Sequence, residues 1–477
     1  MDETNRSQGL AQLAMARLLA NRDLCSAAAD LAMQVIAMSP EMADAWALFG
    51  AVNMKPTPLR RAVIINPDHC DALTDLAQMT GGEPAAIFFE AALKSDPGYL
   101  PALTNYGLWL QNRGQSAAAL PYLADCVAID PGHDVFWSNL STTAIGAGFP
   151  DSGIRTANRA LTIRPEAAAA QYNLGMSHLM RGELEKGFIG HESRFAAGAV
   201  PDPHIPGNRW HGEIAPEDIL LVYAEQGLGD SLLFVRFVPE ASRRVRRLIL
   251  LVQPELVGLF QPIAGAFLVL PFGTSLPEYD LICPLMSLGL VLGARIDQIP
   301  PPPALLVDPI AKAEFQRRLS KLPGLKVGLV WQGNPAFPGD RTRSIPLASL
   351  RPLASVPFVT LISLQKESTP TPHTDVPELV NWMDEISNLT QTAALIESLD
   401  LIIAVDTMLG HLSGNLGKPV WIMNRFNTCW RWFLDRSDSP WYPTLTLFRQ
   451  STPGDWDDVI GHVAEELAKY VSHRLGK

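Results

Sequence analysis

The feature that most limits the fold is a series of prolines along the first third of the chain. Each proline follows an alanine-rich, helix-like segment, and the positions are Pro40, Pro67, Pro97, Pro131 and Pro165. The intervals between them are 27, 30, 34 and 34 residues. Proline ends a helix because it lacks an N–H group and its ring clashes with the preceding turn. Repeats of this length predict stacked helical hairpins that bury their apolar faces against one another.

The later repeats also share small residues at matching positions. Tyr106-Gly107, Ala119 and Leu123 precede Pro131, and Leu174-Gly175 lies in the last repeat. In period and in these residues the segment resembles the tetratricopeptide repeat family. The resemblance implies an α-helical tetratricopeptide solenoid, and we expect it to occupy a first domain of residues 1–195.

Three asparagines, Asn105, Asn139 and Asn173, recur at 34-residue intervals within this solenoid. Each side-chain amide carries donors and an acceptor, so a ladder of amides can pair with the main chain of an extended peptide. In this respect the segment resembles the asparagine-lined superhelix of the eukaryotic O-GlcNAc transferase. The alternative is that the amides bond to neighbouring helices and shape the stack. We expect these three residues to bind an acceptor peptide.

A Pro- and Gly-rich segment, residues 196–217, reads as a linker to a second kind of structure. The apolar run at residues 219–223 is typical of a buried strand, and it ends in a turn with Gly227, Gly229 and Asp230. Glycines let the backbone turn tightly and approach a ligand. Asp230 alone could equally be a helix cap, because Asp is a preferred residue there.

Further strands and helices alternate up to the C-terminus, with a break at the proline run 300–303. A short strand is expected at residues 305–307, before the helix that opens the second series. The strand at residues 326–331 ends on Gln332-Gly333-Asn334. Alternating strands and helices predict parallel sheets, here two Rossmann-like lobes at residues 218–308 and 309–477.

The most informative stretch of the second lobe is residues 399–422. An apolar strand ends on Asp406-Thr407, a helix of small and apolar residues follows, and His411 lies one turn after Thr407. The free N–H groups and positive dipole of a first helical turn suit a phosphate. Asp406 can accept from a sugar hydroxyl and Thr407 can donate to a phosphate oxygen. The alternative is a capped helix with a core histidine.

Several motifs together resemble the heptosyltransferase-like domain of glycosyltransferase family 9, which has the GT-B fold and occurs fused to tetratricopeptide repeats in bacteria. They are AEQGLGD at 224–230, VWQGNP at 330–335, RSIPL at 343–347, SLQK at 363–366, AVDTMLGHLSGNLGKPVW at 404–421 and SPWYP at 439–443. The resemblance implies that Asp230 is the general base. It implies that Arg343, Asp406, Thr407 and His411 bind the donor. From their places in turns at strand ends, we expect Gly229, Gly333, Asn334 and Lys366 to belong to the same donor site.

Composition narrows the remaining function classes. Of the 477 residues 47% are hydrophobic and 18% charged, with a formal net charge of −11. This balance fits a globular protein and argues against a nucleic-acid partner. The five cysteines are dispersed, without a disulfide or metal spacing. No apolar stretch reaches membrane-spanning length, so we expect a cytoplasmic protein.

We therefore expect a glycosyltransferase that moves a sugar from a nucleotide-sugar donor to a hydroxyl of a protein held by the repeats. One acceptor that the resemblance implies is flagellin, modified with a nonulosonic acid. No DxD motif follows a strand, so we expect no cofactor and no obligatory metal. Two alternatives stay open at this point. The acceptor could be a saccharide or lipid, with repeats that serve oligomerisation, or the protein could be a non-catalytic scaffold.

Overall fold

The computed structural model describes residues 3–337, 339–366, 375–376 and 378–476. The chain divides into two compact units. The first unit comprises Met1–Ala147 and Thr162–Arg164, and the second comprises Gly148–Leu161 and Pro165–Lys477. The division falls inside the repeat region, so the last repeat belongs to the same unit as the α/β lobes.

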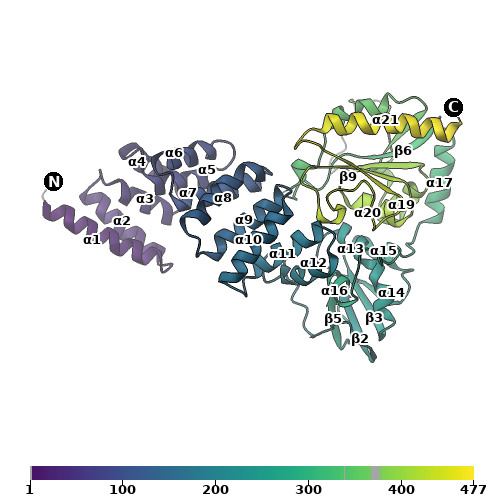
Figure 1. The fold of residues 1–477 in the computed structure, drawn as a ribbon, viewed down its shortest axis with the longest axis horizontal. Coiled ribbons are helices and arrows are strands. Elements are labelled where there is room, and N and C mark those ends of the chain that lie inside the picture. The colour runs from purple at the N-terminus through teal and green to yellow at the C-terminus, as the bar shows by residue number, and fades with distance from the viewer. Residues whose placement is uncertain (1–2, 338, 367–374, 377, 477) are drawn as a thin grey trace. The chain divides into compact units, whose positions relative to one another are not determined.

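The first unit is built from antiparallel helical pairs, as Figure 1 shows. Its helices are α1 (Glu3–Ala20), α2 (Cys25–Met38), α3 (Ala43–Val52), α4 (Pro56–Ile65), α5 (Cys70–Thr80), α6 (Ala85–Ser95), α7 (Leu100–Asn112), α8 (Ser116–Ile129) and α9 (Asp134–Gly146). Helices α2, α4, α6 and α8 each end two residues before a repeat-closing proline. A methyl group added at Gly107 would lie 2.7 Å from Leu123 Cγ, so the glycine permits α7 and α8 to cross closely. The predicted helical repeats are confirmed.

The second unit begins with α10 (Pro150–Ile163), of which residues up to Leu161 belong to it, and continues with the last hairpin. This hairpin consists of α11 (Ala168–Met180) and α12 (Leu184–His191), followed by the short helix η1 (Glu192–Arg194). A methyl group at Gly175 would lie 2.6 Å from the backbone nitrogen of His191. Small residues therefore again set the distance between paired helices.

The first lobe contains a parallel five-stranded sheet in the order β1-β5-β2-β3-β4. The strands are β1 (Asn208–Arg209), β2 (Ala215–Tyr223), β3 (Val245–Val252), β4 (Ala266–Pro271) and β5 (Leu281–Pro284). Its helices are α13 (Leu228–Phe234), η2 (Val235–Phe237), α14 (Val238–Ser242), α15 (Pro254–Phe260), η3 (Leu285–Ser287) and α16 (Leu288–Val291). The expected linker contributes β1 and the buried Trp210, whose N–H donates to the carbonyl of Ile282 at 2.9 Å. Part of the linker thus belongs to the sheet.

The prediction of a strand at residues 305–307 is wrong. This segment has no regular secondary structure, and Leu306 N–H donates instead to the carbonyl of Leu259 in α15, at 2.9 Å. The prolines that precede it lack N–H donors, and this disfavours a ladder with a neighbouring strand.

The second lobe contains a parallel six-stranded sheet in the order β11-β10-β9-β6-β7-β8. The strands are β6 (Leu325–Val330), β7 (Val359–Ser363), β8 (Val380–Asn381), β9 (Leu401–Val405), β10 (Val420–Asn424) and β11 (Leu445–Arg449). Its helices are α17 (Pro309–Leu319), η4 (Asp340–Thr342), η5 (Leu347–Leu350), α18 (Arg351–Ala354), η6 (Met383–Glu385), α19 (Leu389–Glu397), α20 (Met408–Asn415), η7 (Trp430–Trp432) and α21 (Trp456–Leu475).

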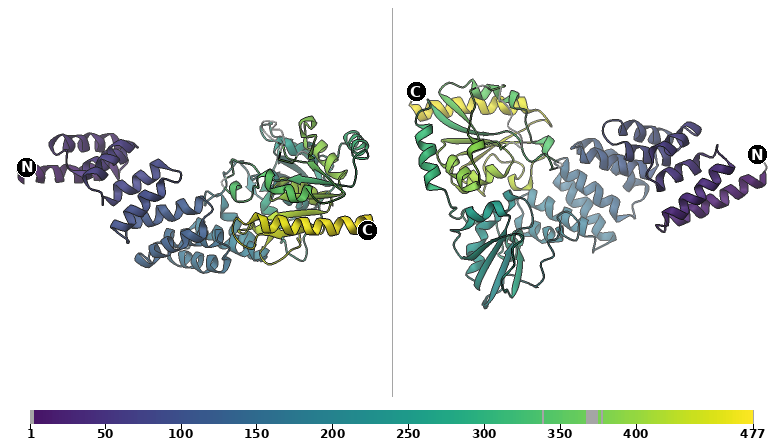
Figure 2. Two further views of the ribbon diagram at one scale, coloured as in Figure 1. Left: turned by 90° about the horizontal axis from the view of Figure 1, so that it is seen from above. Right: turned by 180° about the vertical axis from the view of Figure 1, so that it is seen from behind.

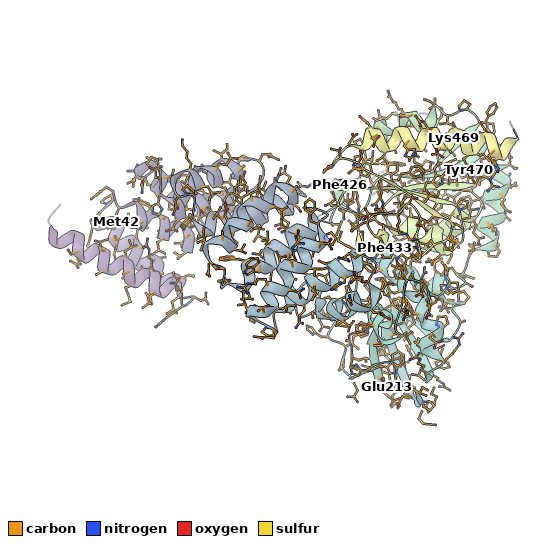
Figure 3. The ribbon with its side chains drawn as sticks, viewed as in Figure 1. Met42, Glu213, Phe426, Phe433, Lys469 and Tyr470 are labelled. Carbon is orange, nitrogen blue, oxygen red and sulfur yellow. The ribbon has the colours of Figure 1, made fainter. Side chains whose placement is uncertain are left out.

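Helix α21 covers the side of the second lobe that lies away from the first lobe, as the views in Figures 1 and 2 agree. Val463 and Leu467 of α21 are fully buried in the apolar core of this lobe. Tyr470 of α21, labelled in Figure 3, packs edge-on against Trp421 of β10 with 5.6 Å between ring centroids. The first lobe instead contacts the second lobe through α13 and α20.

Strand order reverses once in each sheet. In the first lobe the chain runs outward from β2 through β3 and β4, then returns to the other side of β2 with β5. In the second lobe it runs outward from β6 and returns to the other side with β9. Ligands of open α/β sheets bind at the carboxyl ends of strands where the order reverses. Two such lobes form the predicted GT-B fold, and its reversal points lie after β2, β6 and β9.

Candidate functional site

The turn after β2 holds Asp230 by both of its carboxylate oxygens. Gly227 is the N-cap residue of α13, and its N–H donates to Oδ2 of Asp230 at 2.9 Å. The other oxygen, Oδ1, accepts from the guanidinium of Arg431 in the second lobe. Asp230 is therefore both a cap and one half of an ion pair that joins the lobes.

Arg431 is a site residue that the sequence did not reveal. It lies on η7, between Trp430 and Trp432, in the segment that follows β10. Its Nη1 donates to Cys429 Sγ at 3.0 Å, and its guanidinium lies 4.6 Å from the ring centroid of Trp430. Burial alone would lower the pKa of Arg431, but Asp230, Cys429 and Asp406 together outweigh burial, so the pKa is raised overall. An arginine between two tryptophans after a buried strand was the available signal.

Arg343 connects the turns after β6 and β9. Its Nη1 donates to the carbonyl oxygen of Asp406 at 2.8 Å, and its Nε donates to Oδ1 of Asp340 at 2.9 Å. A methyl group at Gly333 would lie 2.2 Å from Oδ1 of Asp340 and 2.4 Å from Nη2 of Arg343. The structure thus brings together the predicted residues Gly333, Arg343 and Asp406. Asp340, which orients Arg343, was not predicted.

The turn after β9 carries an unsatisfied hydroxyl. Thr407 is the N-cap residue of α20 with extended backbone angles, yet its side chain does not cap the helix. Its Oγ1 is buried and has no hydrogen-bond partner among the described residues. The preceding Asp406 is 8% exposed. An unpaired buried hydroxyl costs free energy, so this group is suited to a bound ligand with an acceptor oxygen.

His411 is packed as a core side chain between the lobes. It is buried, it stacks on Trp432 at a centroid distance of 5.0 Å, and its Nδ1 lies 3.1 Å from the Tyr442 hydroxyl. A methyl group at Gly229 of the first lobe would lie 3.0 Å from His411 Cδ2. Burial lowers the pKa of His411 to about 3, so the ring is neutral at pH 7. Direct donor contacts by Gly229 and His411 stay predictions.

Two predicted donor residues lie on the exposed side of their loops. Asn334 Oδ1 accepts from the N–H of Ala336 at 3.0 Å, a bond within its own turn. Lys366 is exposed, and its Nζ donates to the carbonyl of Ile386 at 3.0 Å. Within the described residues, neither side chain is hydrogen-bonded to Arg343, Asp406 or Thr407. Their donor-binding role stays a prediction.

The three asparagines of the predicted ladder differ in exposure. Asn105 on α7 and Asn139 on α9 belong to the first unit and are partly exposed. Asn173 on α11 belongs to the second unit and is 6% exposed. A buried amide has less surface to offer to a peptide than the other two. Peptide binding by these residues stays a prediction.

A buried ionic network joins the last repeat to the first lobe. Arg194 of η1 donates to Glu225 at 2.9 Å, and both side chains are 0% exposed. Arg194 also donates to Glu192 at 2.9 Å and to the hydroxyl of Ser287 at 2.8 Å. Burial raises the pKa of Glu225 to about 7, although the guanidinium of Arg194 opposes this rise. Because Glu225 lies in the turn after β2, the last repeat supports the segment that carries Asp230.

Helix α11 of the last repeat also contacts η7 directly. Tyr172 of α11 is within electrostatic range of Arg431 and Asp230, and its ring lies 5.8 Å from that of His191. Nearby, a cavity of about 560 Å³ is bounded by the end of α11, Ile296 and the loop after η7, which includes Phe433 (Figure 3). The last repeat thus packs against the segment that carries Arg431.

No group of three or more His, Cys, Asp or Glu side chains in the part of the chain that the structure describes could hold a metal ion. The helices of the described ranges are also all too short or too polar to cross a bilayer.

Fold and site define a class of protein, a GT-B domain fused to helical repeats. No family model matches the chain. It is similar to Protein FlbA of Caulobacter vibrioides (strain ATCC 19089 / CIP 103742 / CB 15), with 24% identity over 482 residues, which cover 86% of this chain and 80% of that protein.

Solved structures are similar to the α/β part of the chain and to its repeats separately. The glycosyl transferase family 9 protein from Veillonella parvula DSM 2008 is 11% identical, with a TM-score of 0.40, and the match covers 56% of this chain and 99% of that chain. YrrB, a TPR protein with an unusual peptide-binding site, is 18% identical with a TM-score of 0.29 over 35% of this chain and 92% of its own. At these identities and scores, none of the structures identifies a substrate.

Proposed function

We propose that the protein is a glycosyltransferase that moves a sugar from a nucleotide-sugar donor to a hydroxyl of a protein acceptor. One observation carries this proposal. The turn after β2, at the strand-reversal point of the first lobe, meets the second lobe, where Asp230 contacts Arg431 of the segment after β10. A carboxylate is thereby paired with a cation at a place where open α/β sheets bind ligands.

The second lobe supplies the donor side of the site. Arg343 is held by Asp340 and by the Asp406 carbonyl, and its planar guanidinium suits phosphate oxygens. The N–H groups at the start of α20 and the unpaired Thr407 hydroxyl add further donors. These groups are suited to bind the phosphate of a nucleotide sugar and to stabilise the charge that develops on it as it leaves.

The first lobe supplies the base. In the transfer, the acceptor oxygen forms a bond to the anomeric carbon while the bond between that carbon and the phosphate oxygen breaks. The phosphate leaves with the bonding electron pair, and the proton of the acceptor hydroxyl passes to the carboxylate of Asp230. Arg343 and the first turn of α20 stabilise the negative charge on the leaving phosphate. The proposed base and the groups that stabilise the leaving phosphate all belong to this chain.

The last repeat supports a protein acceptor. It is bonded to the first lobe through the Arg194–Glu225 ion pair, and Tyr172 approaches the Asp230–Arg431 pair. A polypeptide bound at the last repeat would therefore lie close to the base. Flagellin as acceptor and a nonulosonic acid as sugar form the finer part of the proposal, and the support for them is the family resemblance.

Two measurements test the proposal. Calorimetric titration with UDP, GDP, ADP and CMP should find one nucleotide that binds the wild type and binds Arg343→Gln about 10–100-fold more weakly, because a charge-assisted bond is lost. Arg351→Gln is the matched control, since Arg351 is exposed and its ion-pair partner is Asp375, at 3.9 Å. Binding of none of the nucleotides, or equal binding by Arg343→Gln, would contradict the donor site.

The acceptor is tested by intact-mass analysis of proteins from cells with and without this chain. A hexose- or nonulosonate-sized mass difference on a protein that co-purifies with the repeats supports the proposal. A difference found only on saccharides or lipids would instead support the alternative acceptor class. The triple variant Asn105→Ala, Asn139→Ala, Asn173→Ala should weaken acceptor binding and leave nucleotide binding unchanged.

A further inference from the structure

Arg431 occupies a position that the proposed function does not by itself explain, because it covers the carboxylate that has to act as a base. We infer that Arg431 exchanges partners during the reaction. It pairs with Asp230 in the absence of donor and with the donor phosphate in its presence, so donor binding uncovers the base. This inference rests on the proposed function, and it makes Arg431 a phosphate-binding residue that also sets the order of substrate use.

The first step of the argument concerns the oxygens of Asp230. Oδ2 accepts the N–H of Gly227 at 2.9 Å, a bond that holds the first turn of α13. Oδ1 is the oxygen that contacts Arg431. The Asp230 side chain is only 18% exposed, so little of it is open to another group. An acceptor hydroxyl therefore needs the oxygen that Arg431 covers.

The second step concerns what else Arg431 can bind. Within the described residues its side-chain hydrogen bonds go to Cys429 and Asp230, which leaves further N–H groups of the guanidinium for a ligand. It is also within electrostatic range of Asp406, at the turn where the donor phosphate is proposed to bind. The guanidinium thus contacts Asp230 directly and is influenced by the charge of Asp406.

The third step compares the two partners. A phosphate diester or diphosphate offers several anionic oxygens and permits a bidentate pair with a guanidinium. Asp230 offers Arg431 one oxygen, because the other is committed to Gly227. A phosphate bound at the start of α20 can therefore compete for Arg431. Once Arg431 turns to the phosphate, Oδ1 of Asp230 is open to the acceptor hydroxyl.

A double-mutant cycle of anion binding tests the exchange. Inorganic pyrophosphate and the nucleotide that the wild type binds tightest are titrated by calorimetry into full-length wild type, Asp230→Asn, Arg431→Gln and the double variant. Asp230→Asn should bind both probes about 5–10-fold more tightly, because Arg431 no longer has to leave a carboxylate. Arg431→Gln should bind them about 10-fold more weakly, and the double variant should match Arg431→Gln.

Each other pattern overturns the inference. If Asp230→Asn tightens binding equally in the Arg431→Gln background, the effect is a general loss of negative charge and Arg431 does not exchange. If Asp230→Asn leaves affinity unchanged or weaker, the ion pair is a fixed link between the lobes. If Arg343→Gln loses affinity but the cycle shows no coupling, the proposed donor site stands and only this inference fails.

A separate control shows whether each variant folds. Melting temperatures of all four proteins are compared, and Arg431→Lys keeps a cation where the Gln variant would unfold. A folded Arg431→Lys should keep part of the coupling to Asp230. The matched surface control is Arg243→Gln, whose arginine is 72% exposed and pairs with Glu240, and it should bind the probes like the wild type.

Discussion

The turn after β2 and the turn after β9 differ in how completely their polar groups are paired. In the first lobe, both oxygens of Asp230 have partners within the chain. In the second lobe, the Thr407 hydroxyl is buried without a partner among the described residues, although it stands at a helix start. The comparison indicates that the turn proposed to bind the donor has a polar group free for a ligand, whereas the turn proposed to supply the base is closed by an internal ion pair.

The largest effect on activity is expected from a substitution of Asp230, in the turn after β2. Asp230→Asn keeps the shape of the side chain but removes the base, so transfer should fall about 10²–10⁴-fold. The measurement is the rate of sugar transfer by folded protein, with the melting temperature recorded on the same preparation. Asp455→Asn is the control, because Asp455 also caps a helix, α21, by accepting from Asp458 N–H at 3.2 Å. Full activity of Asp230→Asn would reduce this residue to a cap.

The site at the turn after β9 can be disturbed by a substitution in the turn after the neighbouring strand β6. Gly333→Ala places a methyl group 2.2 Å from Asp340 Oδ1 and 2.4 Å from Arg343 Nη2, so both side chains have to move. Nucleotide affinity should fall about 10-fold or more, as expected for a displaced charge-assisted bond. Gly461→Ala is the control, since nothing lies within 4 Å of a methyl group added there. Equal nucleotide affinity in both variants would remove Arg343 from the donor site.

The histidine between the two turns gives a pH test. Burial lowers the pKa of His411 to about 3, so in the folded protein it stays neutral between pH 7 and 5. The unfolded chain binds a proton near pH 6.5, so stability is lost as the pH falls below that value. The wild type should lose about 2 kcal/mol more free energy of unfolding between pH 7 and 5 than His411→Gln. The exposed His473 provides the control, His473→Gln, which should follow the wild type.

The smallest effect is expected at Thr407, where it distinguishes a hydroxyl that binds a ligand from one that stabilises the fold. Thr407→Val removes the unpaired hydroxyl, so the free protein should be as stable as the wild type or slightly more stable. Nucleotide affinity should nevertheless fall by about 1 kcal/mol, the net value of one hydrogen bond. Thr392→Val is the control, because the Thr392 hydroxyl donates to Asn388 at 3.2 Å and its loss should only destabilise. Unchanged affinity in Thr407→Val would leave the hydroxyl without a function.

The sequence predicted those parts of the site that depend on local patterns. Apolar runs that end in Gly, Asp or Thr located the turns after β2, β6 and β9 because strand, turn and helix are contiguous there. The repeat prolines located the helices for the same reason. The strand at residues 305–307 failed because an apolar run alone does not show whether a ladder partner is available. Strand β11 was missed, although it completes the edge of the second sheet.

Arg431 could not be assigned in this way. Its contact with Asp230 joins residues 201 positions apart, and it lies on a single turn of helix that has no periodic pattern. Asp340 is similarly placed by η4, within a polar loop. The Asp230–Arg431 contact follows from how the two lobes pack, and the sequence of either lobe alone does not show it.

The buried Arg194–Glu225 pair has a consequence for how freely the repeats can be exchanged. A shortened chain that starts after Arg194 would leave Glu225 enclosed without its cation, and loss of one member of a buried pair costs about 3–5 kcal/mol. The last repeat therefore cannot be removed without destabilising the first lobe. The helices before Gly148 can be exchanged without removing this pair, whereas the hairpin of α11 and α12 has to be kept together with the lobes.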